Sequence, residues 1–164
     1  MTDSNSKYKI RELTIFDIEK VAELYNELAY YVQSETSDPY FDFKQLSIDE
    51  ISSYLKGTLY KENFKTYVVE YENSIIGFIS GEIVSCFLPI STTRKIGYIN
   101  GCYINEHHRK QGLTKTLLNH LVEFFKKSRI KYVELHYIVG NSEAEKAWTS
   151  LGFSTFRIQM RKTL

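Results

Sequence analysis

The strongest constraint on the fold is a short basic segment, containing one glycine, between two segments of different periodicity. The segment reads His108-Arg109-Lys110-Gln111-Gly112-Leu113-Thr114. It follows a strand-like run at 96–104 and opens a helix-like run with apolar residues at Leu113, Leu117, Leu118, Leu121 and Phe125. Such a turn directs backbone N–H groups and the positive end of the helix dipole toward one point, which predicts a phosphate or pyrophosphate site. The alternative is that Gly112 only permits a tight turn and the neighbouring cations are solvated.

Two common nucleotide-binding motifs are missing from the sequence. No segment reads Gly-x-x-x-x-Gly-Lys-Ser/Thr, and none reads Gly-x-Gly-x-x-Gly. The turn is therefore neither a Walker loop nor a dinucleotide fingerprint.

A second informative segment runs from Asn141 to Phe153. Ser142 and Glu145 have capping-box spacing, which predicts the start of a helix. One face of this helix then carries Ala144, Ala147, Trp148 and Leu151. Gly152 suits a left-handed cap at its end. Most of this face suits core packing, but the Asn141 amide lies between a strand and a helix, where it could bridge elements or a ligand.

The two segments together resemble the GNAT superfamily of acetyl-CoA-dependent N-acyltransferases. The family's phosphate motif, Arg/Gln-x-x-Gly-x-Gly/Ala, is similar to the segment from Arg109 to Thr114. The family's later pattern is similar to the set Asn141, Ala144, Trp148, Gly152 and Phe153. The run at 98–104 also resembles the family's central strand.

Two departures from the family pattern bear on the chemistry. Thr114 stands where Gly or Ala is usual and adds a hydroxyl beside the phosphate site. Trp148 stands where many members carry a tyrosine thought to protonate the leaving thiolate. An indole N–H has no useful acidity, so Trp148 cannot take that role.

Composition indicates an ordinary globular protein. The chain has 164 residues, 43% hydrophobic and 25% charged, so we expect one domain at 8–164 after a loose tail at 1–7. A formal net charge of +1 does not favour nucleic acid as a partner. No apolar run approaches the roughly 20 residues that span a bilayer, and the N-terminus lacks a signal-peptide pattern. The two cysteines, Cys86 and Cys102, indicate no disulfide framework, so we expect a cytoplasmic protein without a membrane partner.

Periodicity and capping patterns predict the order of elements. Strands are expected at 8–13, 66–71, 75–84, 96–104, 131–139 and 153–161. Helices are expected after the Thr14–Asp17 and Ser47–Glu50 boxes, over 113–128 and after Asn141, with a loop at 34–46. The result is a mixed α/β (α+β) domain with a parallel, right-handed βαβ unit and an antiparallel hairpin. The resemblance implies a GNAT-type, mostly antiparallel sheet whose strands splay apart around the long helix.

The resemblance implies acetyl-CoA as co-substrate and no metal. The residues expected at its pyrophosphate are Arg109, Lys110, Gln111, Gly112, Leu113, Thr114 and Lys115. Those expected at the pantetheine arm are Cys102, Tyr103 and Ile104, with Asn141, Ala144, Ala147 and Trp148 on the other side. Lys110 and Lys115 are equally explained as solvated charges.

Catalysis needs a group that removes a proton from the amine. An alkylammonium with a pKa near 10.4 must lose a proton, which costs roughly 4–5 kcal/mol at neutral pH. The candidate bases are Glu82, through water, and His136, although either could be structural. The thiolate could leave unassisted or take a proton from Tyr103 or Tyr137. A covalent intermediate on Cys102 is disfavoured because nothing nearby is arranged to form its thiolate.

Of the parts of the site, the acceptor-binding part is the one that the sequence determines least. By family analogy its wall is 30–50, and the named candidates are Tyr30, Tyr31, Glu35 and Asn100. An acidic, aromatic wall suits a cationic amine, although solvated acids over core aromatics explain the same residues. We expect an N-acetyltransferase that acts by direct attack, in a ternary complex, of a primary amine of a small cationic molecule. Alternatives are a protein or peptide amine and a non-catalytic acyl-CoA-binding module, and a homodimer is left open.

Overall fold

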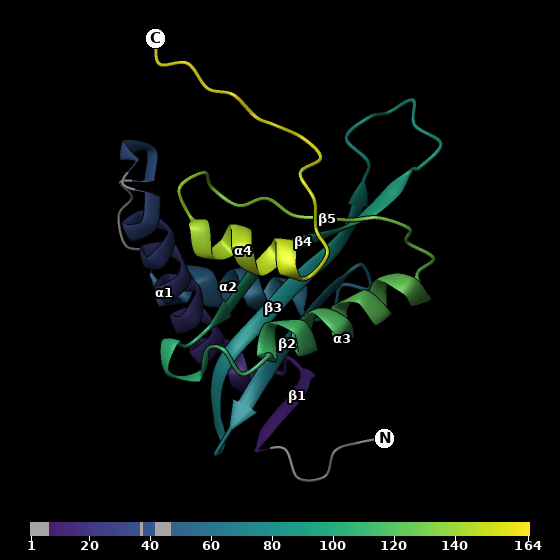
Figure 1. The fold of residues 1–164 in the computed structure, drawn as a ribbon. Helices are drawn as coiled ribbons and strands as arrows, with labels where there is room; N and C mark the ends of the chain where they lie inside the picture. Colours follow the sequence, from purple (N-terminus) through teal and green to yellow (C-terminus); the bar gives the residue numbers. More distant parts are fainter. Residues whose placement is uncertain (1–6, 37, 42–46) are drawn as a thin grey trace.

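The computed structural model describes residues 7–36, 38–41 and 47–164. Its strands are β1 (Tyr8–Glu12), β2 (Phe64–Tyr71), β3 (Ser74–Ser85), β4 (Lys95–Ile104) and β5 (Val133–Glu134). Its α-helices are α1 (Ile18–Thr36), α2 (Ile48–Thr58), α3 (Leu113–Lys127) and α4 (Ser142–Ser150). Short 3-10 helices lie at Ile15–Asp17, Pro39–Phe41 and Glu106–His108. Figure 1 shows the helices on both sides of a twisted sheet.

The sheet has the order β1-β2-β3-β4-β5. The first four strands pair antiparallel with their neighbours, and β4 pairs with β5 in parallel. Because α3 connects β4 to β5, these elements form the predicted βαβ unit, and the predicted mixed fold class is confirmed. The β2–β3 hairpin turns through Glu72 and Asn73, with φ of 47° and 64°. Both residues are left-handed, as a two-residue hairpin loop requires.

The sheet buries both of its faces. Val68 and Phe78 pack with α1 and α2, whereas the next residues, Val69 and Ile79, pack under α3. The apolar residues predicted for one face of α3 are all buried: Leu113, Leu117, Leu118, Leu121 and Phe125. A sheet covered on both faces explains why β3 is buried at consecutive positions rather than at alternate ones.

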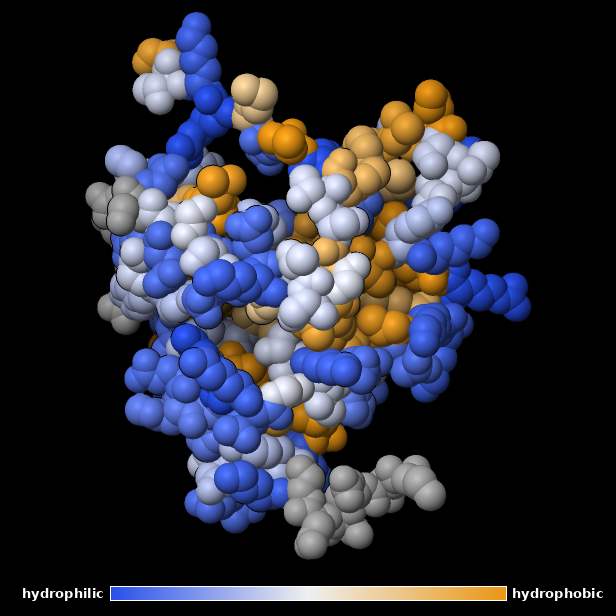
Figure 2. Space-filling view, in the orientation of Figure 1, coloured by the Kyte–Doolittle hydropathy of each residue, from blue (hydrophilic) through white to orange (hydrophobic). Residues whose placement is uncertain are grey.

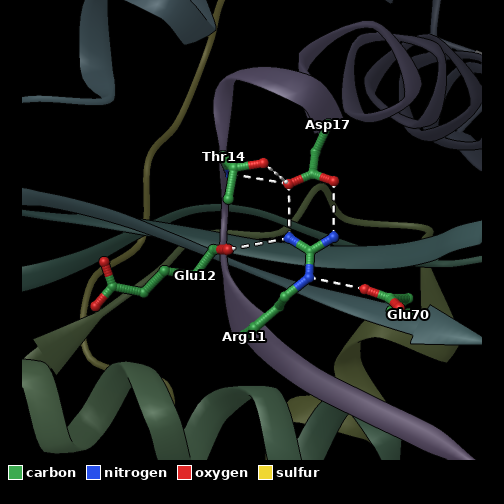
Figure 3. A network of polar contacts seen from close by, with 5 residues as sticks. All are labelled: Arg11, Glu12, Thr14, Asp17 and Glu70. Atoms are coloured by element: carbon green, nitrogen blue, oxygen red, sulfur yellow. Dashed lines mark hydrogen bonds and ion pairs between the residues drawn. The ribbon is translucent and has the colours of Figure 1, made fainter. Parts of the chain in front are cut away.

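A partly buried ion pair fixes the start of α1 against the sheet (Figure 3). The Arg11 guanidinium on β1 donates to both carboxylate oxygens of Asp17, at 2.6 and 2.8 Å, and to Glu70 on β2 at 2.8 Å. The Asp17 carboxylate also accepts from the backbone N–H and the hydroxyl of Thr14. The predicted Thr14–Asp17 pairing is therefore present, with Arg11 as its unpredicted partner. The Ser47–Glu50 capping box is present as predicted.

Three sequence-based boundaries are wrong. The helix α1 continues to Thr36, into the expected loop at 34–46, whose residues 37 and 42–46 lie outside the described residues. The strand expected at 131–139 is reduced to β5, and the strand expected at 153–161 is not formed. Both of these segments alternate in hydrophobicity, but a strand also needs a neighbouring backbone, and none is paired with 135–139 or 154–161 in the described structure.

Candidate active site

The predicted phosphate turn has the geometry of an open helix N-terminus. Gly112 is the N-cap of α3 and has φ of 73°, a left-handed conformation that favours glycine. Lys110, with φ of 60°, is also left-handed, so the turn is tightly wound. Within the described residues no side chain caps this helix end, so the first N–H groups of α3 remain available to an anion. Gln111 and Lys115 are exposed beside it, and Thr114 is half-buried.

The Arg109 side chain connects the turn to β4 and to α1. Its Nε donates to the carbonyl of Ile104 at 3.0 Å, which links the turn to the last residue of β4. Its guanidinium lies 4.9 Å from the centre of the Tyr31 ring and 5.4 Å from that of Tyr103. The side chain that we expected at the phosphate is thus stacked between α1 and β4, where it can position the turn.

An opening separates β4 from β5 beside this turn. The two strands pair only at Gly97–Val133 and Tyr98–Glu134, although β4 continues to Ile104. A β-bulge between β3 and β4 leaves Asn100 opposite no residue, because Ser80 pairs with Gly101 and Gly81 with Ile99. Beyond Tyr98, the β5-facing edge of β4 has no strand partner among the described residues. An extended ligand could pair with this edge as an added strand.

A cavity of about 300 Å³ lies where β4 and β5 begin to separate. Its lining is Glu82, Val84, Ser85, Phe87, Ile96, Tyr98, Glu134 and Arg157. Glu82, on β3, accepts a hydrogen bond from the Asn100 amide at 3.0 Å, so the bulge residue orients this carboxylate. Two carboxylates, two aromatic rings and one arginine therefore line this open hollow.

The Tyr98 hydroxyl shares a hydrogen bond with Nδ1 of His136 behind the cavity. Burial is the main cause of a raised Tyr98 pKa, to which Glu134 adds and which Arg157 opposes. Tyr98 is therefore a neutral phenol at physiological pH. His136 is exposed and lies just beyond the last paired residue of β5, so it connects Tyr98 with solvent.

Sequence reasoning missed every residue of the cavity wall except Glu82, and the charged and aromatic residues among those missed are Phe87, Tyr98, Glu134 and Arg157. Glu134 could have been predicted, because it lies two residues before the candidate His136 and therefore on the same face of a strand. Phe87 and Arg157 lie on irregular segments, and nothing local in the sequence indicates that these segments meet. Their rings and guanidinium do meet, with 4.5 Å from Arg157 to the centre of the Phe87 ring.

A sequence model of the Acetyltransferase (GNAT) family matches residues 18–153, which contain both motifs and most of the cavity wall. The chain belongs to this family. No curated protein sequence matched the chain.

Solved structures of GNAT-like proteins share the fold at low identity. A mutant of the BH1408 protein from Bacillus halodurans is 23% identical, with a TM-score of 0.83 over 95% of this chain and 99% of that one. AAC(6')-Iy in complex with the bisubstrate analog CoA-S-monomethyl-acetylneamine is 14% identical, with a TM-score of 0.77 over 97% and 99%. A predicted acetyltransferase with acetyl-CoA from Clostridium acetobutylicum is 17% identical, with a TM-score of 0.72 over 95% and 96%.

In this GNAT chain the second motif builds the start of α4. The N-cap is Asn141 rather than the expected Ser142: the buried Asn141 side chain accepts from the Ala144 N–H at 3.0 Å. The Asn141 oxygen is thus engaged in capping. Gly152 has φ of 92°, as its predicted left-handed cap requires. Ala144 is half-buried, but Ala147 is exposed, so the expected apolar face is narrower than four residues.

Trp148 packs as the sequence indicated for most of that face. Its ring lies 5.4 Å from that of Phe153, edge to face, and it contacts the core under α3. The two candidate proton donors lie apart from each other and from the cavity wall. Tyr103 faces α1 beside Glu27 and Arg109, and Tyr137 lies beside Glu145 of α4. Burial is the largest cause of a raised pKa at both phenols.

The expected acceptor wall is divided by the fold. Tyr30, Tyr31 and Glu35 lie on the last turns of α1, where Tyr31 stacks on Arg109, and none of the three lines the cavity. Asn100 touches the cavity only through Glu82. Residues 42–46 of the expected wall lie outside the described residues. Among the described residues we find no cluster of His, Cys, Asp or Glu suited to a metal ion and no helix with the length and apolarity that crossing a bilayer needs.

Proposed function

We propose that the protein is an acetyl-CoA-dependent N-acetyltransferase that acts on a primary amine of a small cationic molecule. One observation carries this proposal: the β4–β5 opening runs from the uncapped N-terminus of α3 to an acidic cavity. From Ile104 back to Tyr98, at ~3.3 Å per residue, β4 spans about 20 Å. An extended co-substrate with a phosphate end and a reacting end fits this arrangement. Residues 8–164 would act as one domain.

The turn would hold the pyrophosphate of acetyl-CoA through backbone N–H groups. The helix dipole adds roughly 0.3–1 kcal/mol, and backbone donors lose no side-chain entropy on binding. Gln111, Thr114 and Lys115 can contribute further contacts from the helix start. Arg109 would position the turn, because its Nε and its stacking partners already hold it against β4 and α1.

The pantetheine arm would lie along the open edge of β4. Backbone groups at 100–104 on the β5 side would pair with its amides, as an added strand does. Asn141, Ala144 and Trp148 would form the opposite side through α4. Acetyl-CoA supplies an activated acetyl group, and the thioester carbonyl would lie near the bulge at Asn100.

The cavity would bind the acceptor amine beside this carbonyl. Glu82 and Glu134 oppose the single charge of Arg157, so the wall carries a net negative charge that attracts an ammonium. Tyr98 and Phe87 add aromatic faces for cation–π contacts. AAC(6')-Iy, which shares the fold, was solved with an acetylneamine-based bisubstrate analog. This supports an acceptor of the small, polyamine-like class.

Glu82 would accept the proton that the ammonium must lose. Its carboxylate lies on the cavity wall and is held by the Asn100 amide. The amine nitrogen then attacks the carbonyl carbon, the carbon–sulfur bond breaks, and the sulfur leaves with its electron pair. The attacking nitrogen loses its second proton to the leaving thiolate or to water, which leaves a neutral amide. Tyr98, when it donates to Nδ1 of His136, keeps its oxygen lone pairs free to orient the ammonium. Tyr98 is thus a positioning residue.

Direct attack is favoured over a covalent acyl-enzyme. Burial raises the pKa of the Cys102 thiol to about 12, so the thiolate is not formed at physiological pH. Trp148 cannot protonate the leaving sulfur. A thiol has an ordinary pKa of about 8.5, so the thiolate can leave without a proton donor. If a donor takes part, Tyr137 is the candidate phenol on the α4 side of the opening.

A thiol-release assay tests the proposal. Acetyl-CoA is incubated with the protein and with a panel of diamines, polyamines, aminoglycosides, amino acids and lysine peptides, and free CoA is measured. We expect release above the buffer rate for a cationic small amine, with an N-acetylated product by mass spectrometry. Calorimetric binding of acetyl-CoA without release for any amine would instead identify a non-catalytic acyl-CoA-binding module.

A further inference from the structure

The bulge at Asn100 is flanked by glycines on both of its strands. Gly81 lies beside it on β3 and Gly101 follows it on β4, so neither neighbour has a side chain that could fix its geometry. Asn100 must nevertheless keep its place, because its amide donates to the Glu82 carboxylate at 3.0 Å. Contacts from other side chains are therefore needed to hold the bulge.

On the α3 side the bulge meets apolar side chains. Ile79 and Ile99 belong to the buried cluster under this helix, and a Cβ at Gly81 would lie 2.8 Å from Cδ2 of Leu121. Figure 2 shows apolar surface, in orange, between α3 and α4. Apolar contact is non-directional, whereas a hydrogen bond fixes the direction of the two groups that it joins. The α3 side therefore covers the bulge without fixing its geometry.

On the α1 side one tyrosine contacts both strands at the bulge. The Tyr25 hydroxyl shares a hydrogen bond of 2.5 Å with Ser80, the β3 residue that pairs with Gly101. The Tyr25 ring covers Gly101, because a Cβ there would lie 3.2 Å from Cε1 of the ring. The ring also stacks on Phe78, with 4.2 Å between the ring centres. Tyr25 thus holds together the last residue pair before the register shift.

The Tyr25–Ser80 hydrogen bond is well protected and close to the proposed base. Ser80 is fully buried, and burial raises the pKa of Tyr25, so the phenol stays neutral. Breaking the bond would leave a buried hydroxyl unpaired, which is costly. Ser80 and Glu82 are two residues apart on β3 and therefore lie on the same face of the strand. The bond and the carboxylate are neighbours along this face.

We propose that Tyr25 and Ser80 are positioning residues of the acceptor site: their hydrogen bond holds the bulge, so that Asn100 keeps Glu82 on the cavity wall. This inference rests on the proposed function, in which Glu82 accepts the proton of the ammonium. Neither Tyr25 nor Ser80 lines the cavity, so both act through the backbone at the bulge. A merely structural pair would affect stability and leave the turnover of the folded protein unchanged.

Kinetics of single and double variants test this role. Tyr25→Phe and Ser80→Ala each remove one hydroxyl and should each lower kcat and kcat/KM for the amine together, by about 10-fold. The affinity for acetyl-CoA should not change, because the phosphate turn is intact. The double variant should lose no more than either single variant, because both hydroxyls act through one bond. Thr58→Val removes a buried hydroxyl that donates to the Leu55 carbonyl within α2, and this matched control should keep wild-type turnover.

Hydrogen exchange followed by mass spectrometry tests the bulge without any acetyl transfer. In Tyr25→Phe the amides of 80–82 and 99–101 should exchange about 5-fold faster than in the wild type, relative to the amides of β2. Thr58→Val should leave this ratio unchanged. Wild-type exchange at the bulge in Tyr25→Phe would overturn the proposal.

The outcomes separate this inference from the proposed function. If the wild type acetylates an amine and both single variants turn over as Thr58→Val does, the positioning role is overturned and the transferase remains. Losses that multiply in the double variant would also overturn it, because the two hydroxyls would then act independently. A wild type that acetylates no amine contradicts the proposed function. Faster exchange at the bulge in Tyr25→Phe would then still support the Tyr25–Ser80 pair as the contact that holds the bulge, and unchanged exchange would overturn it.

Discussion

The Tyr98 hydroxyl and Nδ1 of His136 share a hydrogen bond at the point where β4 and β5 separate. The bond joins the wall of the acidic cavity to a side chain exposed to solvent. Tyr98 is the last residue of β4 that pairs with β5. The bond holds its phenol next to the space where the amine and the thioester would meet. The Tyr98–His136 pair therefore sets the position of the phenol at the place where the proposed reaction would occur.

Tyr98→Phe should weaken binding of the amine. Loss of one hydrogen bond, worth roughly 1 kcal/mol, should raise the amine KM about 5-fold. The KM for acetyl-CoA should not change, because Tyr98 lies away from the phosphate turn. Steady-state kinetics with each substrate varied separately measure both constants. Tyr132→Phe, at an exposed ring, is the control; an unchanged amine KM in Tyr98→Phe would remove this residue from the acceptor site.

Gly112→Asp should weaken CoA binding more than it disturbs folding. The carboxylate would oppose both the phosphate and the positive end of α3. Gly112→Ala is the matched control: a Cβ at this position meets nothing within 4 Å, and alanine has the same difficulty as other side chains with the left-handed backbone. Titration calorimetry on both variants should show a markedly larger loss of affinity for Asp. Equal affinities would place the phosphates elsewhere.

Trp148→Phe should keep most of the turnover, because Trp148 packs against Phe153 and the α3-side core. The lost volume should cost about 1–3 kcal/mol of stability. Removing a proton donor would instead lower kcat by roughly 100-fold or more. The measurement is kcat at saturating substrates on folded protein. A hundredfold loss with CoA binding intact would show a catalytic role, and a higher kcat in Trp148→Tyr would show that the missing phenol limits this enzyme.

Stability should fall with acidification through Asp17. Hydrogen bonds from Arg11, the largest cause, lower its pKa from 3.8 to about 2. Because the folded pKa lies below the unfolded one, the stabilisation is complete above about pH 4 and is lost between about pH 4 and 2. Asp17→Asn should therefore lower the unfolding free energy by on the order of 2 kcal/mol at pH 7 and by little at pH 2. Urea unfolding at several pH values, with exposed Asp49→Asn as control, measures this; a pH-independent difference would contradict it.

Local features of the sequence predicted local structure well. The Ser47–Glu50 box, the apolar stripe of α3 and the left-handed Gly112 and Gly152 all depend on residues within one or two turns. Both GNAT motifs are likewise short and lie at the ends of elements. These features are sufficient for the fold class and for the turn.

The rest depends on contacts between distant segments. Arg109 reads as a phosphate ligand, but Tyr31 on α1 draws its guanidinium into a stack that no local pattern indicates. The lengths of β5 and of the last strand could not be predicted, because alternation shows that a segment can be a strand and not whether another backbone lies beside it. The cavity wall is equally non-local, since Phe87 and Arg157 meet only in the folded chain.

The most direct test of the proposed chemistry is the turnover of Glu82→Gln. The amide keeps the shape of the side chain but cannot accept the proton of the ammonium, so kcat at saturating acetyl-CoA and amine should fall roughly 100-fold or more. Acetyl-CoA binding should stay at the wild-type level, and Glu62→Gln, outside the cavity wall, should keep wild-type turnover. Wild-type turnover in Glu82→Gln would contradict the assignment of the β3 carboxylate and its cavity as the place where the acetyl group is transferred.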